Sequence, residues 1–140
     1  MIKMNIQVLG SKAVANQFKA KRANFDATIS NAIKKSAGLV ENSAKQNCPS
    51  KTGNLKNSIH SEFSKKGFEA HIGPDETTAP YAYWVEVGHK QTPGRYVHAI
   101  RRRLVASFVR GHWFMSKAYI ANRRKVVSEI ERAFNNSITK

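Results

Sequence analysis

Cysteine is almost absent from the sequence, since Cys48 is the only one in 140 residues. One cysteine cannot form a disulfide within the chain, and this usage is typical of proteins made in a reducing cytoplasm. No histidine pattern accompanies Cys48 that would make its thiol a nucleophile, and a small buried or helix-end residue is the simpler interpretation. Cysteine chemistry is therefore not expected to carry the function.

Long hydrophobic runs are also missing. No apolar stretch approaches the roughly 20 residues that a membrane-spanning helix needs, and residues 1–6 lack the long apolar core of a signal peptide. The chain is long enough for one modest hydrophobic core, and no internal repeat divides it. We therefore expect a single domain over residues 1–140 and no membrane partner.

Acidic residues are scarce: nine Asp and Glu stand against 24 Lys and Arg, which leaves a net charge of +15. Such a charge favours polyanionic partners, namely DNA, RNA or the acidic surface of another protein. No acidic residue lies between Glu86 and Glu129. The basic residues of this interval are Lys90, Arg95, Arg101, Arg102, Arg103, Arg110, Lys117, Arg123, Arg124 and Lys125. The positive charge is therefore concentrated in one part of the chain.

The N-terminal third predicts a strand followed by a long helix. Apolar and polar residues alternate from Ile2 to Val8, as in a half-buried strand. From Lys12 to about Asn47, apolar residues recur at helical spacing with lysines on the other side. A break of this helix near Asn24 is an alternative that the sequence leaves open. Pro49 ends the helix. Its apolar side chains expected in the core include Phe18, Phe25 and Ile29.

Residues 49–59 place turn-forming residues and lysines around Gly53. Lysines and bare backbone amides suit a phosphate, but the full P-loop spacing is absent and a structural turn is favoured. Two alternating runs, 59–63 and 68–72, then predict a β-hairpin, with a turn at 73–76. His60 and His71 could face each other in this hairpin. Because no third ligand has a fitting spacing, we expect surface polar residues and no metal site.

The most aromatic stretch, residues 79–89, predicts a short helix. Pro80 suits the first helical position, and Gly88 suits a C-terminal position with positive φ. One face of this helix would carry Tyr81, Trp84, Val85 and Gly88. A strand is the competing interpretation, with alternation of Tyr81, Tyr83, Val85 and Val87.

The segment from Lys90 to Gly111 is too basic to be buried and too apolar for a plain linker. We interpret this long basic loop, about 89–111, as a protruding loop or hairpin that contacts a partner, with a solvated charge run as the alternative. Helical spacing then resumes from Met115 to Phe134, and a frayed tail is expected at 135–140.

The sequence lacks the positioned acids, bases and nucleophiles that an enzyme needs. No metal-binding, nucleophile-elbow or paired-carboxylate pattern is present, so we expect no catalytic residue, no metal and no cofactor. Glu86, between Trp84 and His89, is interpreted as one half of an ion pair with an arginine, either within the chain or across a subunit boundary. A basic nuclease that uses His98 or His112 is the weaker hypothesis.

A nucleic-acid-binding module would explain the charge. The cluster Arg101–Arg103 could neutralise phosphates, and Tyr96 or Trp113 could stack on bases. No helix-turn-helix, zinc-finger or RNP-like pattern is visible, however, and most aromatic residues lie in apolar runs.

Four segments in order carry a resemblance to a known family. They are CPSKTGNLKNSI (48–59), YAYWVEVGH (81–89), PGRYV (93–97) and GHWFMSKA (111–118). Together they resemble the HK97 gp10-like family, the small tail-completion (head–tail joining) proteins of tailed bacteriophages and prophages. There a long N-terminal helix precedes a P-x-x-T-G-x-L-x-x-S-I turn and a Y-A-x-x-V-E-x-G-[TH] helix. The resemblance covers most of residues 12–134. The sequence departs from the family pattern at Val87, where an aromatic residue is common. It also departs in the long basic insertion from Lys90 to Gly111.

This resemblance implies an α+β fold, with a small antiparallel β-sheet packed against a long N-terminal helix and a C-terminal helix. It also implies a structural virion protein that forms a ring, typically of six copies, at the head-proximal end of the tail, through which DNA passes. The implied partners are head–tail connector and tail-terminator or tail-tube proteins. The expected location is the neck or tail of the virion, after assembly in the bacterial host cytoplasm. The alternative function is a free-standing basic nucleic-acid-binding protein.

Two sets of contact residues follow as hypotheses. Inter-subunit or partner contacts are expected at Tyr81, Trp84, Glu86, His89 and Trp113. Contacts with DNA in the lumen or with an acidic partner are expected at Lys90, Arg95, Arg101, Arg102, Arg103 and Arg110.

Overall fold

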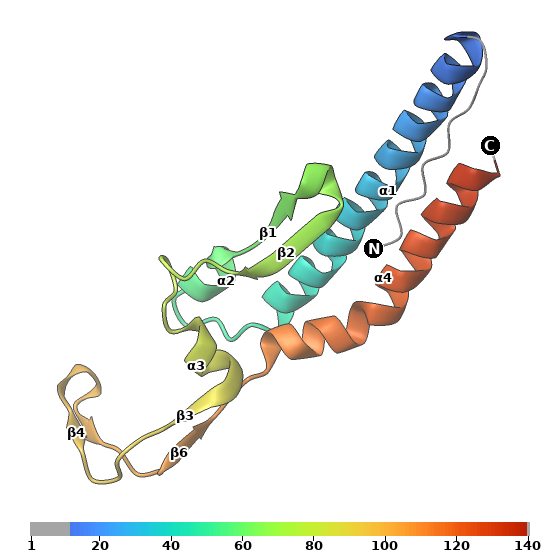
Figure 1. Cartoon of the computed structure of the whole chain (residues 1–140). Coiled ribbons are helices and arrows are strands. Elements are labelled where there is room, and N and C mark those ends of the chain that lie inside the picture. The colour runs from blue at the N-terminus through green and yellow to red at the C-terminus, as the bar shows by residue number, and fades with distance from the viewer. Residues whose placement is uncertain (1–11, 140) are drawn as a thin grey trace, which may run out of the picture.

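The computed structural model describes residues 12–139, and the strand expected from Ile2 to Val8 lies outside them. Two long helices, α1 (Lys12–Asn47) and α4 (Phe114–Ile138), lie side by side and run in opposite directions (Figure 1). A β-hairpin packs against α1. A thin arm extends from the end of the body where α1 ends and α4 begins. The helices and the hairpin form the body, and the arm stands apart from it.

The helix α1 keeps its expected bounds and does not break near Asn24. The hydroxyl of Thr28 donates a hydrogen bond to the Asn24 carbonyl oxygen at 2.8 Å, one turn back in the same helix. Phe25 packs edge-on against Phe134 of α4, with ring centroids 5.7 Å apart, and Ile29 is buried. The packing of α1 along α4 therefore holds the helix together where its own sequence is weakest.

The helix α4 begins at Phe114 and continues to Ile138, so it includes residues 135–138 of the expected tail. An ion pair joins it to α1, from Lys35 Nζ to Glu129 Oε2 at 2.9 Å. Asn122 is buried against α1 and satisfies its side-chain amide within α4, by donating to the Ala118 carbonyl oxygen at 2.8 Å. Such a bond removes the penalty of a buried amide without a partner.

The predicted hairpin is confirmed, with strands β1 (Ile59–Ser64) and β2 (Glu69–Pro74) joined by the 3₁₀ turn η1 (Lys65–Gly67). The strands are antiparallel, and Ile59 lies opposite Pro74. A short helix that the sequence did not predict, α2 (Asn54–Ser58), precedes them. Gly53 begins this helix with φ of 83°, a left-handed conformation that glycine adopts without strain.

His60 and His71 are not opposite each other in this register. His60 lies opposite Gly73, and His71 lies opposite Glu62. Among residues 12–139 there is no group of three or more His, Cys, Asp or Glu side chains placed to hold a metal ion. The structure therefore offers the two histidines no metal-binding arrangement.

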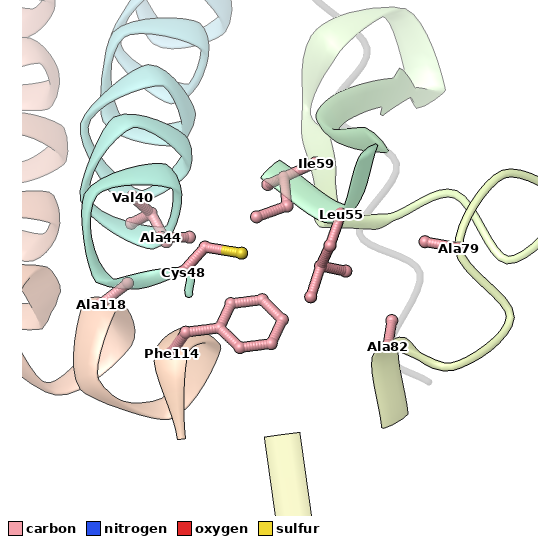
Figure 2. Packing of buried hydrophobic residues seen from close by; sticks show 9 residues of the cluster. All are labelled: Val40, Ala44, Cys48, Leu55, Ile59, Ala79, Ala82, Phe114 and Ala118. Carbon is pink, nitrogen blue, oxygen red and sulfur yellow. The ribbon is translucent and has the colours of Figure 1, made fainter. Parts of the chain in front are cut away.

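The hydrophobic core lies where α1, α2, β1 and the start of α4 converge (Figure 2). Phe114 and Ile59 are its largest fully buried side chains. The other members are smaller: Val40, Ala44, Cys48, Leu55, Ala79, Ala82 and Ala118. Cys48 is thus a buried core residue, and burial raises the pKa of its thiol. A raised pKa disfavours the reactive thiolate, as expected of a structural cysteine.

The remaining elements form α3 and the arm. After α3 (Ala82–Val87) come the strands β3 (Gly88–Lys90) and β4 (Tyr96–Val97), then the 3₁₀ turn η2 (His98–Ile100). The strands β5 (Arg102–Arg103) and β6 (Phe108–Arg110) return toward the body. The pairs β1–β2, β3–β6 and β4–β5 form three separate two-stranded sheets. The α+β class is confirmed, with the strands divided among three small antiparallel sheets. No helix of residues 12–139 is long and apolar enough to cross a membrane.

Candidate interaction surface

The aromatic stretch folds as the predicted helix rather than as a strand. Its helical residues begin at Ala82, two positions after Pro80. The helix ends at Gly88, whose N–H donates to the Trp84 carbonyl oxygen. Gly88 has φ of 87° and ψ of 176°, a backbone conformation open essentially to glycine alone. This glycine turns the chain directly from α3 into the first strand of the arm.

Glu86 performs a structural role that the sequence did not reveal. Its two carboxylate oxygens accept hydrogen bonds from the backbone N–H groups of Met115 and Ser116, each at 3.0 Å. The Ser116 hydroxyl adds a third bond at 2.7 Å. Trp113 occupies the N-cap position of α4 and has no side-chain acceptor, so Glu86 supplies the cap from a distant part of the chain. A carboxylate there also complements the positive end of the helix dipole.

Within the described residues, this contact takes the place of the arginine expected for Glu86, and an ion pair across a subunit boundary stays a prediction. No arginine of residues 12–139 forms a salt bridge with Glu86, although arginines surround it in the sequence. The reason is spatial, because α3 ends beside the first turn of α4 and its unpaired N–H groups. Two backbone bonds hold the same junction: His112 N–H donates to Val85 O, and Trp113 N–H donates to Glu86 O. Its three bonds within the chain occupy both carboxylate oxygens of Glu86.

Two glycines make the neck, the point where the arm leaves the body. Gly88 lies opposite Arg110 in the β3–β6 pair, and Gly111 packs on the backbone of residues 86–88. A Cβ at Gly111 would overlap the Glu86 carbonyl oxygen and lie 2.5 Å from the Val87 carbonyl carbon. The neighbouring atoms are backbone and cannot rotate away. Only glycine therefore lets the two strands of the arm meet the end of α3 so closely.

We expect Gly111→Ala to destabilise the protein by about 1–3 kcal/mol, because the added methyl group must push backbone segments apart. Urea unfolding followed by circular dichroism measures this loss. The matched control is Gly38→Ala in α1, where a Cβ meets nothing within 4 Å. There alanine should stabilise the helix by about 0.5–1 kcal/mol. Equal effects of the two substitutions would contradict the close packing at the neck.

The basic segment forms the expected protruding hairpin, which we call the arm (residues 88–110). Backbone hydrogen bonds continue between the sheets, from Gln91 N–H to Ser107 O at 3.0 Å and from Gly94 N–H to Leu104 O at 2.8 Å. Near the tip, Arg103 Nη1 donates to the Gly94 carbonyl oxygen at 2.7 Å. The arm is thus a continuous two-stranded structure that extends away from α1 and α4 (Figure 1).

The arm exposes its basic and apolar side chains together. All six cations of the second contact set are exposed. None of them forms a salt bridge with a carboxylate in the described part of the chain. Val105 is 90% exposed, and Ile100 and Phe108 are about half exposed. Because these apolar side chains are exposed together outside the core, contact of the arm with another molecule remains an expectation.

An open groove of about 850 Å³ lies where the arm joins the body. Apolar side chains line much of it, including Leu55, Trp84 and Val109. Lys51 from the turn before α2 and Arg110 from β6 also line it. No acidic residue is among its lining residues. The full lining is Pro49, Lys51, Thr52, Gly53, Leu55, Tyr81, Trp84, Val85, His89, Lys90, Val109, Arg110 and His112. We call this surface the groove.

The groove brings together part of each expected contact set. Tyr81, Trp84 and His89 line it with Lys90 and Arg110. Trp113 lies outside the groove, near Gly111 of the neck and Phe108 of β6. The other arginines belong to the distal part of the arm: Arg95, Arg101, Arg102 and Arg103. Whether these residues contact subunits, partners or DNA stays a prediction.

The sequence interpretation missed several groove residues. Lys51, Leu55, Val109 and His112 come from segments far apart in the chain. The lysines and backbone amides around Gly53 could suit a phosphate in the sequence. In the structure, this turn lines a largely apolar groove. In the sequence, only Lys51 and the position of this turn between two predicted elements indicated that the turn lies on the surface. No local pattern could have paired this turn with β6, because the register of the arm decides their proximity.

The β1–β2 hairpin carries carboxylates that are tied to local partners. His60 Nε2 lies 3.1 Å from Glu62, and its Nδ1 lies 2.9 Å from the Ser58 carbonyl oxygen. These contacts raise the pKa of His60, the carbonyl contact most of all. Asp75 accepts hydrogen bonds from the hydroxyls of Thr77 and Thr78, which lower its pKa to about 2. The Asp75 contacts stabilise the turn after β2, and none of these groups lines the groove.

Comparison with known families matches α1, the hairpin and α3, but not α4. A family model for bacteriophage HK97-gp10, described as a "putative tail-component", matches residues 12–88, more than half of the chain. No curated protein and no solved structure matches the chain. The match runs from the start of α1 through α3 and ends at Gly88, so the arm and α4 lie beyond it. It covers less than the residues 12–134 expected from the sequence. The chain therefore belongs to the HK97-gp10-like family of bacteriophage tail components.

Proposed function

We propose that this chain is a tail-completion protein, a structural component whose copies form a ring at the head-proximal end of a phage tail. Six copies are the number that the family resemblance implies. The ring would contact head–tail connector and tail-terminator or tail-tube proteins, and DNA would pass through it. The copies would assemble in the bacterial host cytoplasm and remain in the neck of the virion. Family membership supports the tail location, and the exposed surface supports assembly.

The observation that carries this proposal is the large amount of exposed apolar surface. Among residues 12–139, sixteen large hydrophobic side chains are exposed, whereas only Phe114 and Ile59 are large and fully buried. Exposed apolar residues occur singly on many proteins, but here they extend over the arm, α3 and α4. A chain with so small a core gains stability when neighbouring copies or other virion proteins cover this surface.

The arm suits an interface that repeats around a ring. In a ring, the arm of one copy would contact a different surface of the next copy. Contacts of this heterologous kind close into a ring when the rotation between copies divides a full turn. Cations on the arm would then face either the DNA in the lumen or an acidic neighbouring protein.

We also propose that the role is structural rather than enzymatic. Glu86, the carboxylate of greatest interest in the sequence, is occupied by α4 and is not free to act on a substrate. Nuclease activity in the purified protein that a single His or Glu substitution abolishes would overturn this proposal.

The proposal is tested by shortening the arm. Replacing residues 92–106 with Asn-Gly joins Gln91 to Ser107, which are already hydrogen-bonded neighbours, through a two-residue hairpin turn. We expect the body to keep its melting temperature within a few degrees and the assembled species to disappear. Light scattering at low and high salt, with and without duplex DNA, gives the mass of each form. Electron microscopy shows whether the full-length species is a ring.

The matched control removes the same number of cations from the body by Lys34→Gln, Arg123→Gln, Arg124→Gln and Lys125→Gln, all at exposed positions. This variant should assemble as the original does. A full-length monomer that binds DNA tightly at physiological salt would instead support the free-standing nucleic-acid-binding function. Equal assembly with and without the arm would show that the arm does not form the ring interface.

A further inference from the structure

The lining of the groove combines apolar residues, which we call the floor, with cations, which we call the rim, and this pairing suggests what it binds. Leu55, Val85 and Val109 are aliphatic, and Tyr81 and Trp84 lie among them. Trp84 is 52% exposed, so about half of its surface is available to a partner. Lys51, Lys90 and Arg110 are exposed cations on the same surface. An occupant should therefore bring apolar side chains for the floor and carboxylates for the rim.

The basic rim has no counter-charge within the described chain. None of its three cations forms a salt bridge with a carboxylate of residues 12–139. The lining contains no Asp or Glu. The groove is thus a uniformly positive surface around an apolar floor. Its charge complements an acidic partner and disfavours a basic one.

The net charge of the chain argues against a second copy as the occupant. Each copy carries +15, and its acidic residues number nine. Six of them already hold bonds within the described chain: Glu41, Glu62, Glu69, Asp75, Glu86 and Glu129. A basic copy that entered the basic groove would meet like charges. A different protein with an acidic segment has the required charge.

The floor of the groove argues against nucleic acid as the occupant. Bases bind to single-strand sites by stacking on open aromatic faces. Here Trp84 is flanked edge-on by Tyr83 and His89, with ring centroids 5.3 Å and 6.4 Å away. The rest of the floor is largely aliphatic, and aliphatic side chains offer no stacking surface. Such a floor is better matched by leucine-like or aromatic side chains of a peptide.

We propose that the groove binds an acidic peptide segment with apolar anchor residues, supplied by another protein of the virion. This inference deepens the proposed function, on which it rests for the identity of the partner as a virion protein. Trp84 and Val109 would contact the anchors, and Lys51 and Arg110 would pair with the flanking carboxylates. The groove would then join the ring to its neighbour in the tail or neck, while the arm joins the copies to one another.

The test uses synthetic peptides with the full-length protein. The probe is a peptide of about 12 residues, with five or six Asp and Glu residues and two leucines spaced for one side of an extended chain or helix. Comparison peptides replace the leucines with serine or the acidic residues with lysine. Trp84 reports binding through its fluorescence in a Trp113→Phe background. A single-stranded oligonucleotide serves as the polyanion comparison.

We expect the acidic leucine peptide to bind and to shift the Trp84 emission to shorter wavelength. Its affinity should fall at least tenfold in Lys51→Glu/Arg110→Glu and also in Val109→Ser, because each removes one of the two kinds of contact. Arg124→Glu/Lys125→Glu is the charge-matched control on α4 and should bind as the original does. Raising the salt should weaken the peptide's charge contacts without abolishing its apolar ones.

Three results would overturn the inference. Equal binding of the serine peptide would show a purely ionic surface without a specific groove. Tighter binding of the oligonucleotide at the same residues would assign the groove to nucleic acid. Loss of self-association in Lys51→Glu/Arg110→Glu would assign it to a contact between copies. The mass of each variant is measured in parallel, so that failure of the ring in the original protein is distinguished from failure of peptide binding.

Discussion

Phe114→Ala should cost about 3–5 kcal/mol of unfolding free energy, the largest effect that we expect of any single substitution in this chain. The Phe114 ring is fully buried and lies among Cys48, Leu55 and Ile59 (Figure 2). Half of the other members of this cluster are alanines, so they offer little side chain to fill the space that the ring leaves. A domain of this size has a total stability of roughly 5–15 kcal/mol. The variant should therefore melt far below the original protein or lack a cooperative transition.

Thermal and urea unfolding measure this effect, and two variants make the result specific. Phe114→Leu keeps most of the volume and should lose only about 1 kcal/mol. Phe63→Ala removes the same ring from an exposed position on β1, where the loss should stay below about 1 kcal/mol. Similar losses for Phe114→Ala and Phe63→Ala would show that Phe114 is not the centre of the core.

Glu86→Ala should destabilise the protein by about 2–4 kcal/mol, because three charge-assisted hydrogen bonds disappear together. Two backbone N–H groups in the first turn of α4 lose their acceptor, and Trp113 at the N-cap cannot replace it. The same carboxylate joins α3 to α4, so its loss also loosens the neck. Denaturant unfolding should show a lower midpoint with little change in slope.

Glu86→Gln provides an intermediate case, since its amide keeps one acceptor oxygen but lacks the charge. Its loss should lie between those of the original and Glu86→Ala. Glu131→Ala removes an exposed carboxylate from α4 itself and should change the stability by less than about 0.5 kcal/mol. If Glu86→Ala instead leaves the monomer stable and only abolishes assembly, the inter-subunit interpretation would replace the capping role.

Local patterns in the sequence predicted the secondary structure well where one element dominates a stretch. Apolar spacing predicted three elements: the long helix of residues 12–47, the hairpin and the helix at Trp84. Pro49 and Gly88 marked the ends of the two helices. Sequence patterns were weaker for α2, which has five residues and depends on the left-handed backbone of Gly53. So short a helix is stabilised by the core that it joins rather than by its own propensity.

Contacts between distant segments could not be predicted in the same way. Glu86 was expected to meet an arginine, because charge is visible in a sequence and an unpaired helix end is not. Its actual partners, Met115 and Ser116, lie about thirty positions away and act through backbone N–H groups that every residue has. The groove shows the same limit, since Lys51 and Val109 become neighbours only after the body and the arm have folded.

The neck has a consequence for how this protein can vary. The family match ends at Gly88, and Gly88 pairs directly with Arg110 on the returning strand. Both ends of the arm therefore meet at one hydrogen-bonded step, and everything beyond that step can lengthen, shorten or change sequence without shifting α3 or α4. The entropic cost of a longer excursion grows only slowly with its length. The arm can therefore differ in length and sequence while the body that holds it stays the same.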